Sequence, residues 1–422
     1  MKICIVGLGY IGLPTAAMFA TNGHDVVGVD VNQKVIDALN RGGIVIEEPH
    51  LEETVKQAVD QGTLRASLKP EEADAFIICV PTPIMPDKTA DMTFVENGLR
   101  AVIPYLRKEN ILILESTSPP GTTRDFMGGI LREAGLNPGE DLLVAYCPER
   151  VLPGRILIEL KENNRVVGGI NEKSAEVVRE LYKSFVKGDI YTTDATTAEM
   201  CKLMENTYRD VNIALANELA MICEKMGVNA WKVIEFANKH PRVNLHMPGP
   251  GVGGHCIAVD PWFIIEKQPE ISKIIHLARQ TNDSMPHFVL EKVKALTNDV
   301  QGTKKICVLG VTYKPNVDDM RESPVIELVR LLKEQGDFEI VVVDPHVNFE
   351  GSGDRDVYEA AQDAHLILLA VNHNQFKSLN FSRIKDVMKK PQVLDTRHFW
   401  DALEVEGAGL QYHLLGWGRE QA

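Results

Sequence analysis

The sequence predicts an α/β protein: two Rossmann-like domains with doubly wound parallel sheets, joined by a central all-helical region with one long helix. Residues 2–30 read as strand, glycine-rich turn, helix and strand, which is a βαβ pattern. Residues 197–226 contain neither proline nor glycine and repeat apolar residues at helical spacing over about eight turns. Residues 305–371 repeat the strand pattern of residues 2–80, so a second fold of the same kind follows the helices.

Length and composition limit the classes of protein to consider. The chain has 422 residues, more than one ordinary domain needs, and its 44% hydrophobic and 25% charged residues are typical of a soluble globular protein. The net charge of −14 argues against nucleic acid as the main partner. No apolar run approaches the roughly 18 residues of a membrane span, and the N-terminus leads directly into a strand. We therefore expect a cytoplasmic protein without a membrane partner.

The first domain is expected over residues 1–195 and carries a dinucleotide motif. Gly7-x-Gly9-x-x-Gly12 follows a strand and opens a helix, and Asp30 ends the next strand. The glycines permit a tight turn, the helix N-terminus offers amides to a pyrophosphate, and the carboxylate accepts hydrogen bonds from ribose hydroxyls. Because Asp30 would repel a 2′-phosphate, the predicted cofactor is NAD rather than NADP. The alternative is that the glycines serve only a tight turn.

Two threonines extend this predicted site. Thr82 follows the strand expected at 75–80, and Thr117 follows the strand expected at 111–115. Ligands gather at the carboxyl edge of a parallel sheet, although either threonine could instead cap a helix. The predicted cofactor-binding residues are Gly7, Gly9, Tyr10, Ile11, Gly12, Asp30, Thr82 and Thr117.

The helical centre is expected over residues 196–300. Its long helix is of a kind that spans domains or forms a dimer interface, so a homodimer is the expected assembly. One face of this helix aligns four polar side chains at helical spacing, namely Lys202, Asn206, Arg209 and Asn217. A lysine held in a cleft can act as an acid or base, but such a stripe can equally be a solvated face.

The segment 247–256 is too rich in glycine and proline for a regular helix or strand, and it ends on Cys256. Backbone and ligand can approach closely there, and a helix that follows would lower the pKa of the thiol. The seven cysteines are scattered without zinc spacing, so no metal site is expected. A small buried cysteine is the alternative. That description suits Cys4, Cys79 and Cys307, which lie in predicted strands, and Cys201 and Cys223, which lie on the long helix, better than it suits Cys256. We predict that Cys256 is a nucleophile.

The last domain is expected over residues 301–422. Its strands echo those of the first domain, but Gly310-Val-Thr-Tyr-Lys-Pro315 replaces the glycine motif. Only the first domain is therefore predicted to hold a dinucleotide.

Taken together, these segments resemble the UDP-sugar 6-dehydrogenase family over essentially the whole chain. The matching motifs are Gly7 to Gly12, 115–119, Cys147 to Gly154, Lys202 through Asn206 to Glu218, Gly251 to Asp260, and Tyr313-Lys314 to Ser323. The segments at 199–202, 240–244 and 254–262 look most like those of members acting on UDP-N-acetyl-D-mannosamine. UDP-N-acetylglucosamine is the nearest alternative, and UDP-glucose is a weaker one.

The resemblance implies a four-electron oxidation of a primary alcohol to a carboxylate with two NAD in succession. Cys256 would hold the intermediate as a thiohemiacetal and then a thioester. Lys202 with Asn206 would stabilise the oxyanion and move protons, while Glu149 and Asp260 would manage water and proton transfer.

The resemblance also implies that the third domain holds UDP and that one or more of His240 and Arg242 come from a neighbouring subunit. The implied substrate contacts are Arg150, Val151, Lys202, Asn206, Arg209, His240, Arg242, Gly253, Tyr313, Lys314, Arg321 and Arg397. Two alternatives stay open: a two-electron hydroxyacid dehydrogenase in which Cys256 is incidental, and a non-catalytic NAD-sensing module.

Overall fold

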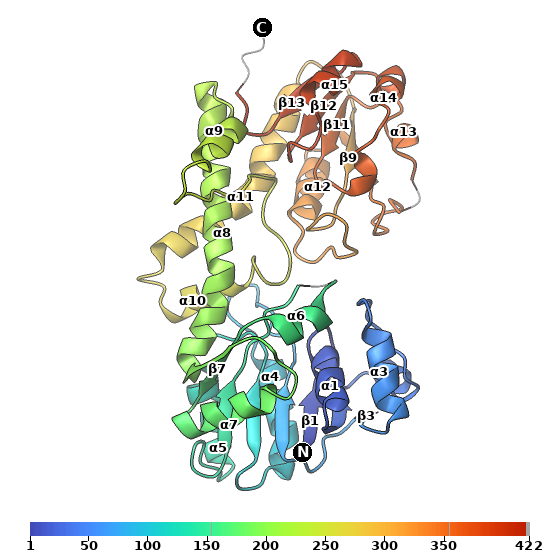
Figure 1. Cartoon of the computed structure of the whole chain (residues 1–422). Coiled ribbons are helices and arrows are strands. Elements are labelled where there is room, and N and C mark those ends of the chain that lie inside the picture. Colours follow the sequence, from blue (N-terminus) through green and yellow to red (C-terminus); the bar gives the residue numbers. More distant parts are fainter. Residues whose placement is uncertain (153, 354, 419–422) are drawn as a thin grey trace. The chain divides into compact units, whose positions relative to one another are not determined.

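The computed structural model describes residues 1–152, 154–353 and 355–418 (Figure 1). The chain divides into two compact units, one of residues 1–205 with 262–269 and the other of residues 206–261 with 270–422. The division falls inside two helices, α8 (Ala195–Met226) and α10 (Asp260–Lys267). None of the helices in the described ranges is long and apolar enough to cross a membrane.

The first unit is built on an eight-stranded sheet in the order β3-β2-β1-β4-β5-β6-β7-β8. Neighbouring strands are parallel except β6 and β7, which are antiparallel. The strands are β1 (Lys2–Val6), β2 (Asp25–Val29), β3 (Leu64–Ser67), β4 (Ala75–Ile78), β5 (Ile111–Leu114), β6 (Leu143–Tyr146), β7 (Arg165–Gly169) and β8 (Ile190–Asp194).

Helices cover both faces of this sheet because successive strand residues point to opposite sides. Ile3 and Ile5 of β1 pack with α1, α2, α3, α6 and α7, whereas Cys4 and Val6 pack with α4 and α5. These helices are α1 (Gly12–Thr21), α2 (Gln33–Asn40), α3 (Leu51–Asp60), α4 (Thr93–Val102), α5 (Gly128–Glu133), α6 (Ile156–Glu162) and α7 (Glu172–Tyr182). A π-helix at Thr122–Met127 leads into α5.

The second unit holds a five-stranded parallel sheet in the order β10-β9-β11-β12-β13. Its strands are β9 (Lys304–Leu309), β10 (Phe338–Val343), β11 (Leu366–Leu369), β12 (Gln392–Asp395) and β13 (Gln411–Leu414). The helices are α9 (Ala230–Ala237), α11 (Lys273–Leu296), α12 (Pro324–Glu334), α13 (Val357–Ala360), α14 (Phe381–Val387) and α15 (Ala402–Gly407).

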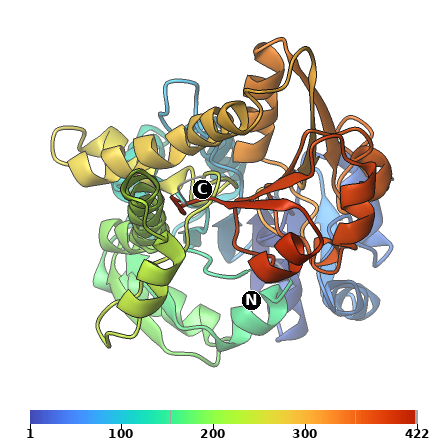
Figure 2. The same cartoon turned by 90° about the horizontal axis from the view of Figure 1, so that it is seen from above.

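The core of the second unit also lies on both faces of its sheet. Cys307 and Leu309 pack with α13, α14 and α15, and Ile306 and Val308 pack with α11 and α12. α11 lies beside α12 on that second face (Figure 1, Figure 2). The order β10-β9-β11-β12 matches β2-β1-β4-β5 of the first unit, so the predicted internal repeat is present in the topology.

The predicted fold class is confirmed: two nucleotide-type sheets and a helical centre with one 32-residue helix. Strand ends differ by a few residues from the predicted ranges, since the strand expected at 75–80 ends at Ile78 and Cys79 already belongs to the following turn. The three-domain boundaries at residues 195 and 300 stay a prediction.

Candidate active site

The glycine turn of the first unit has a backbone that only glycine accommodates. Gly7 has φ +94°, and a Cβ there would lie 2.3 Å from the carbonyl oxygen of Cys79. A Cβ on Gly12 would lie 1.8 Å from the carbonyl oxygen of Gly7. Because glycine has no side chain, the start of α1 can pack directly against the turn. Gly9 faces open space, because a Cβ there would meet no atom within 4 Å. The turn therefore leaves room for a phosphate beside the N-terminus of α1.

Asp30 holds the turn while keeping its carboxylate accessible. Its Oδ2 accepts a hydrogen bond from the backbone N–H of Leu8 at 2.9 Å, and its Oδ1 accepts one from Asn32 at 2.9 Å. The side chain is partly exposed, as are Tyr10 and Ile11 at the mouth of the turn. These residues fit the adenosine ribose and pyrophosphate of NAD, which supplies a hydride acceptor when bound.

Thr82 and Thr117 lie together at the carboxyl ends of neighbouring strands. Thr82 Oγ1 donates a 2.5 Å hydrogen bond to the carbonyl oxygen of Thr117. Neither residue caps a helix, because α4 begins after Met92 and the π-helix begins after Gly121. Both threonines therefore line the edge of the sheet where β4 and β5 end.

Glu149 belongs to a buried ionic cluster. Its Oε2 lies 2.8 Å from Nη2 of Arg165, and its Oε1 accepts a hydrogen bond from the backbone N–H of Arg150 at 2.6 Å. Arg165 also lies 3.9 Å from Glu115, whose carboxylate accepts from the hydroxyl of Tyr182. Burial raises the pKa of Glu115, although the guanidinium of Arg165 opposes that shift. Glu149 is thus fixed by Arg165, which lies outside the motifs quoted from the sequence.

The remaining predicted residues of the first unit lie in the loop between β6 and α6 and on α8. Arg150 forms a 2.5 Å ion pair with Glu205 and donates to the carbonyl oxygen of Asn164 at 3.0 Å. Val151 is partly buried against the core. Lys202 is half-buried on α8, and the ion pairs among the described residues include none for it.

In the second unit the glycine-rich loop before Cys256 is held from two sides. The backbone N–H of Gly249 donates to Oδ1 of Asn217 at 2.9 Å, and Asn217 donates in turn to Oδ1 of Asn282 on α11 at 2.9 Å. Gly254 has φ +86° and packs so closely on the ring of Tyr313 that a Cβ would lie 2.8 Å from it. Asn217 is fully buried, so the solvated-face alternative is wrong for this residue.

Cys256 lies in the turn that leads into α10. Its carbonyl oxygen accepts from the backbone N–H groups of Val259 at 3.0 Å and Asp260 at 2.8 Å. Asp260 is buried, and its Oδ2 accepts a 2.6 Å hydrogen bond from the side-chain amide of Asn206. Two predicted catalytic residues from α8 and α10 are therefore directly linked.

Burial distinguishes Cys256 from several other cysteines. Cys256 is only partly buried, whereas Cys4, Cys147 and Cys307 are fully buried and burial raises the pKa of each to about 12. A thiol with such a pKa stays protonated at neutral pH and is a poor nucleophile. Cys79, predicted to be a structural strand cysteine, instead follows β4 and donates to Glu115 at 3.0 Å.

Polar groups of the loop after β9 gather near Cys256. Burial raises the pKa of the Tyr313 hydroxyl, with smaller contributions from the nearby Asp319 and Cys256. Arg321 is exposed and pairs with Asp319 at 2.7 Å. Lys314 is exposed in the same loop. Gly253 packs against this loop as well, since a Cβ there would lie 3.0 Å from the Cβ of Tyr313.

Arg397 is a half-buried cation whose guanidinium forms no ion pair among the described residues. Its Nε donates to the carbonyl oxygen of Ala370 at 3.1 Å, and its guanidinium packs against Gly249, where a Cβ would lie 2.4 Å from Nη1. Burial lowers its pKa to about 10, although Asp395 acts in the opposite direction. An anionic ligand would relieve this cost of burial.

Two of the remaining predicted substrate residues, His240 and Arg242, stand apart from these clusters, whereas the charge of Arg209 is close enough to Tyr313 to oppose the effect of burial on its pKa. Arg209 is exposed on α8, and His240 and Arg242 are exposed after α9. The backbone N–H of Arg242 approaches His240 Nδ1 at 3.3 Å, which orders this segment locally. Sequence reasoning missed Arg165 and Asn282, whose partners are distant along the chain. It also missed Asp319, although its partner Arg321 is only two residues away.

Three family models match the chain in succession. They are the NAD binding domain of the UDP-glucose/GDP-mannose dehydrogenase family at residues 1–186, its central domain at 196–284 and its UDP binding domain at 307–402. A UDP-N-acetyl-D-mannosamine dehydrogenase of Methanocaldococcus jannaschii is 47% identical, over 99% of this chain and 97% of that protein. An NDP-N-acetyl-D-galactosaminuronic acid dehydrogenase of Ralstonia solanacearum is 45% identical, over 95% and 96%.

Solved structures agree with the sequence relatives. A UDP-D-ManNAc dehydrogenase from Pyrococcus horikoshii matches with a TM-score of 0.92 and 40% identity, covering 100% of both chains. The family resemblance predicted from the motifs is therefore confirmed. The chain belongs to the UDP-glucose/GDP-mannose dehydrogenase family, whose NAD binding domain it carries at residues 1–186.

Proposed function

We propose that this enzyme oxidises UDP-N-acetyl-D-mannosamine to UDP-N-acetyl-D-mannosaminuronate with two NAD per substrate. The observation that carries the proposal is Cys256, a partly exposed thiol on a glycine-rich loop beside the Asn206–Asp260 pair, in a chain that also has two nucleotide folds. A two-electron dehydrogenase needs no such thiol, and a sensing module needs neither the thiol nor the acid–base groups.

The sugar is inferred from relatives. Full-length proteins from Methanocaldococcus jannaschii and from Escherichia coli K12, 47% and 45% identical, bear the name UDP-N-acetyl-D-mannosamine dehydrogenase. The similarly close Ralstonia solanacearum protein is named for an N-acetyl-D-galactosaminuronic acid. An N-acetylhexosamine is the substrate class that these names share. UDP-N-acetylglucosamine and UDP-glucose are the alternatives to be tested.

The proposed UDP contacts are cationic and aromatic side chains, which suit a diphosphate and a uracil ring. Arg397, Lys314 and Arg321 supply positive charge in the second unit, and Tyr313 lies next to Gly253 and Gly254. The other proposed substrate contacts are Arg150, Val151, Lys202, Asn206, Arg209, His240 and Arg242.

The proposed chemistry begins with loss of a proton and a hydride from the C6 alcohol. Lys202 and Asn206 stabilise the developing oxyanion, and a base takes the hydroxyl proton while the hydride leaves to NAD. The product of this step is an aldehyde.

Cys256 then takes part covalently. The thiolate adds to the aldehyde to give a thiohemiacetal, which loses a second hydride to a second NAD and becomes a thioester. Water hydrolyses the thioester to the carboxylate and regenerates the thiol. Glu149 and Asp260 are the carboxylates proposed to orient water and transfer protons. Since Glu149 is fixed by Arg165 at 2.8 Å, its position is set before substrate arrives.

A cytoplasmic homodimer is the proposed form of the enzyme. α8 leaves Tyr208, Leu215, Ile222 and Met226 exposed at spacings of seven, seven and four residues, with exposed fractions of 54%, 52%, 46% and 70%. An apolar stripe at heptad spacing is the pattern by which two helices pack together. A second copy of the chain is proposed to pack against this stripe.

The first prediction concerns stoichiometry and the thiol. With UDP-N-acetyl-D-mannosamine the enzyme should form two NADH per uronate, and Cys256→Ala should lower uronate formation by roughly 10⁴-fold or more because no thioester can form. A spectrophotometric assay over UDP-hexoses and UDP-N-acetylhexosamines, with product analysis by mass spectrometry, measures both. Cys223→Ala, at a buried cysteine of α8, is the matched control. One NADH per substrate, or full activity of Cys256→Ala, would contradict the covalent route.

The second prediction concerns Arg397. Arg397→Met should weaken UDP binding by roughly ten- to hundredfold, because a charged donor to the diphosphate is lost. Calorimetry with UDP measures the effect, with the exposed Lys377→Met as control. Unchanged UDP affinity would remove Arg397 from the site.

The third prediction concerns the assembly. Leu215→Glu should convert the dimer to a monomer, because a carboxylate would be buried in an apolar helix contact. Sedimentation velocity measures the change, and Gln280→Glu adds the same charge at an exposed position of α11 as a control. A dimer that survives Leu215→Glu would move the interface to another surface.

A further inference from the structure

The two nucleotide folds hold their first turn in the same way. In the second unit the backbone N–H of Gly310 donates to the carbonyl oxygen of Val343 at 2.8 Å. Asp344, at the end of β10, accepts from Val311 N–H with Oδ2 at 2.7 Å and from His346 N–H with Oδ1 at 2.9 Å. Asp30 makes the two corresponding bonds in the first unit. An aspartate that fixes the first turn by accepting hydrogen bonds from two backbone N–H groups is thus present in both units.

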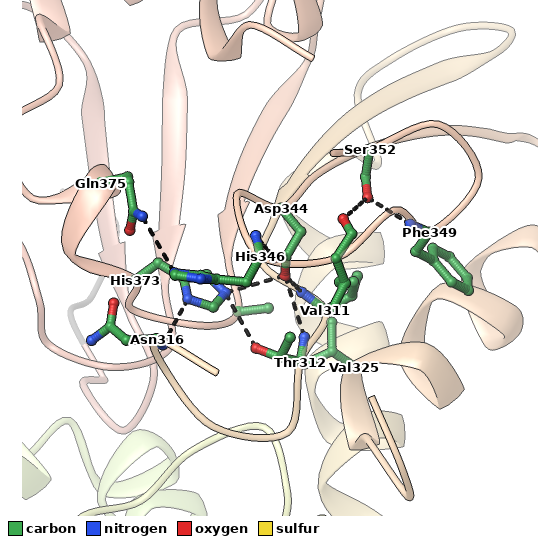
Figure 3. A network of polar contacts seen from close by, with 12 residues as sticks. Val311, Thr312, Asn316, Val325, Asp344, His346, Phe349, Ser352, His373 and Gln375 are labelled. Carbon is green, nitrogen blue, oxygen red and sulfur yellow. Dashed lines mark hydrogen bonds and ion pairs between the residues drawn. The ribbon is translucent and has the colours of Figure 1, made fainter. Parts of the chain in front are cut away.

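The two carboxylates differ in what else they contact. Asp30 is partly exposed, whereas Asp344 is fully buried and its Oδ2 lies 3.1 Å from Nε2 of His373 (Figure 3). Burial alone would raise the pKa of Asp344, but the bonds from His373 and the backbone amides lower it below its ordinary value. His373 lies in the turn after β11, and its ring shares Oδ2 of Asp344 with the backbone amides of Val311 and Thr312. Asp344 therefore has less capacity left to accept hydrogen bonds from a ribose than the partly exposed Asp30 has.

The other nitrogen of His373 holds the loop after β9. Its Nδ1 accepts a hydrogen bond from the backbone N–H of Asn316 at 2.9 Å, so the single ring proton belongs on Nε2, facing Asp344. Asn316 has φ +59° and its side-chain oxygen accepts from the N–H of Asn374 at 2.9 Å. The loop is therefore bonded at two points to the turn that carries His373.

Thr312 closes the same network from the start of the loop. Its hydroxyl donates to the carbonyl oxygen of Lys314 at 2.9 Å and lies 3.2 Å from Nε2 of His373. Thr312 and His373 are both fully buried. Residues 312–316 are thus bracketed by internal bonds, and Tyr313 and Lys314, the proposed UDP contacts, lie between the fixed points.

We infer that His373 is a positioning residue for the UDP site. It bonds to Asp344, which corresponds to the carboxylate that the first fold offers to a ribose. Anchored by this bond, His373 fixes the loop that presents Tyr313 and Lys314. The inference rests on the proposed function, because it takes UDP as the ligand of this loop. A loop that is already ordered loses less conformational entropy on binding, so affinity depends on the network although His373 does not touch the ligand.

Calorimetric titration with UDP alone, compared with titration with NAD, tests the inference on the full chain. His373→Leu should weaken UDP binding by about tenfold or more and leave NAD binding to the first unit unchanged. His373→Asn, which retains an acceptor near the position of Nδ1, should recover part of the UDP affinity. Gln375→Ala is the matched control, since Gln375 is exposed two residues after His373 and contacts His346 in the network (Figure 3). This variant should bind UDP as the unaltered chain does.

Thr312→Val provides a second test that preserves side-chain volume. It removes the hydroxyl that links Lys314 to His373 and should weaken UDP binding in the same direction, by a smaller factor, even if His373→Leu fails to fold. If a folded His373→Leu variant, or Thr312→Val, binds UDP within twofold of the unaltered chain, the inference is overturned. The proposed function would be unaffected by that result. Failure of the unaltered chain to bind UDP would overturn the proposed function together with it.

Discussion

One hydrogen-bonded carboxylate, at the end of the second strand of each nucleotide fold, holds the first turn of that fold. In both folds the carboxylate accepts the backbone amide that follows the first glycine of the turn, and so fixes the turn against the sheet. Asp30 leaves its remaining capacity to accept hydrogen bonds open to a ligand. Asp344 uses that capacity on His373 and on the amide of Thr312. The same local structure therefore yields a coenzyme turn in one half and a rigid, internally bonded loop in the other.

The proposed reaction depends on a second constraint, the burial of thiols. Several cysteines are placed in cores where burial raises the pKa and removes reactivity. Cys256 lies instead at the end of a loop whose glycines pack against Tyr313 and whose backbone is held by Asn217. The loop thus presents the thiol while the amides of Val259 and Asp260 order the turn that follows it.

The sequence predicted those parts of the fold that are local. The glycine motif, Asp30 and the long helix all follow from residue types within one element, and the predicted helix 197–226 lies within α8. The repeat of 2–30 in 305–344 is visible in the sequence because β-branched runs, a glycine after the first run and an aspartate after the second recur in the same order. Strand ends were displaced because the end of a strand depends on which neighbour supplies its hydrogen bonds.

Contacts between distant segments could not be predicted in the same way. Arg165 reaches Glu149 from another strand, and Asn282 reaches Asn217 from another helix. Nothing in the local pattern marks these residues as partners. His373 is the clearest case, since a lone histidine after a strand has no motif, yet it decides what Asp344 can bind.

The division of ligands between the two halves is most directly tested by counting binding sites. Calorimetric titration with NAD, in the absence and presence of saturating UDP, should give one NAD per chain in both cases, and Asp30→Ala should weaken NAD while leaving UDP unaffected. Two NAD per chain, or displacement of NAD by UDP, would contradict the account, because Asp344 would then be open to a ribose after all.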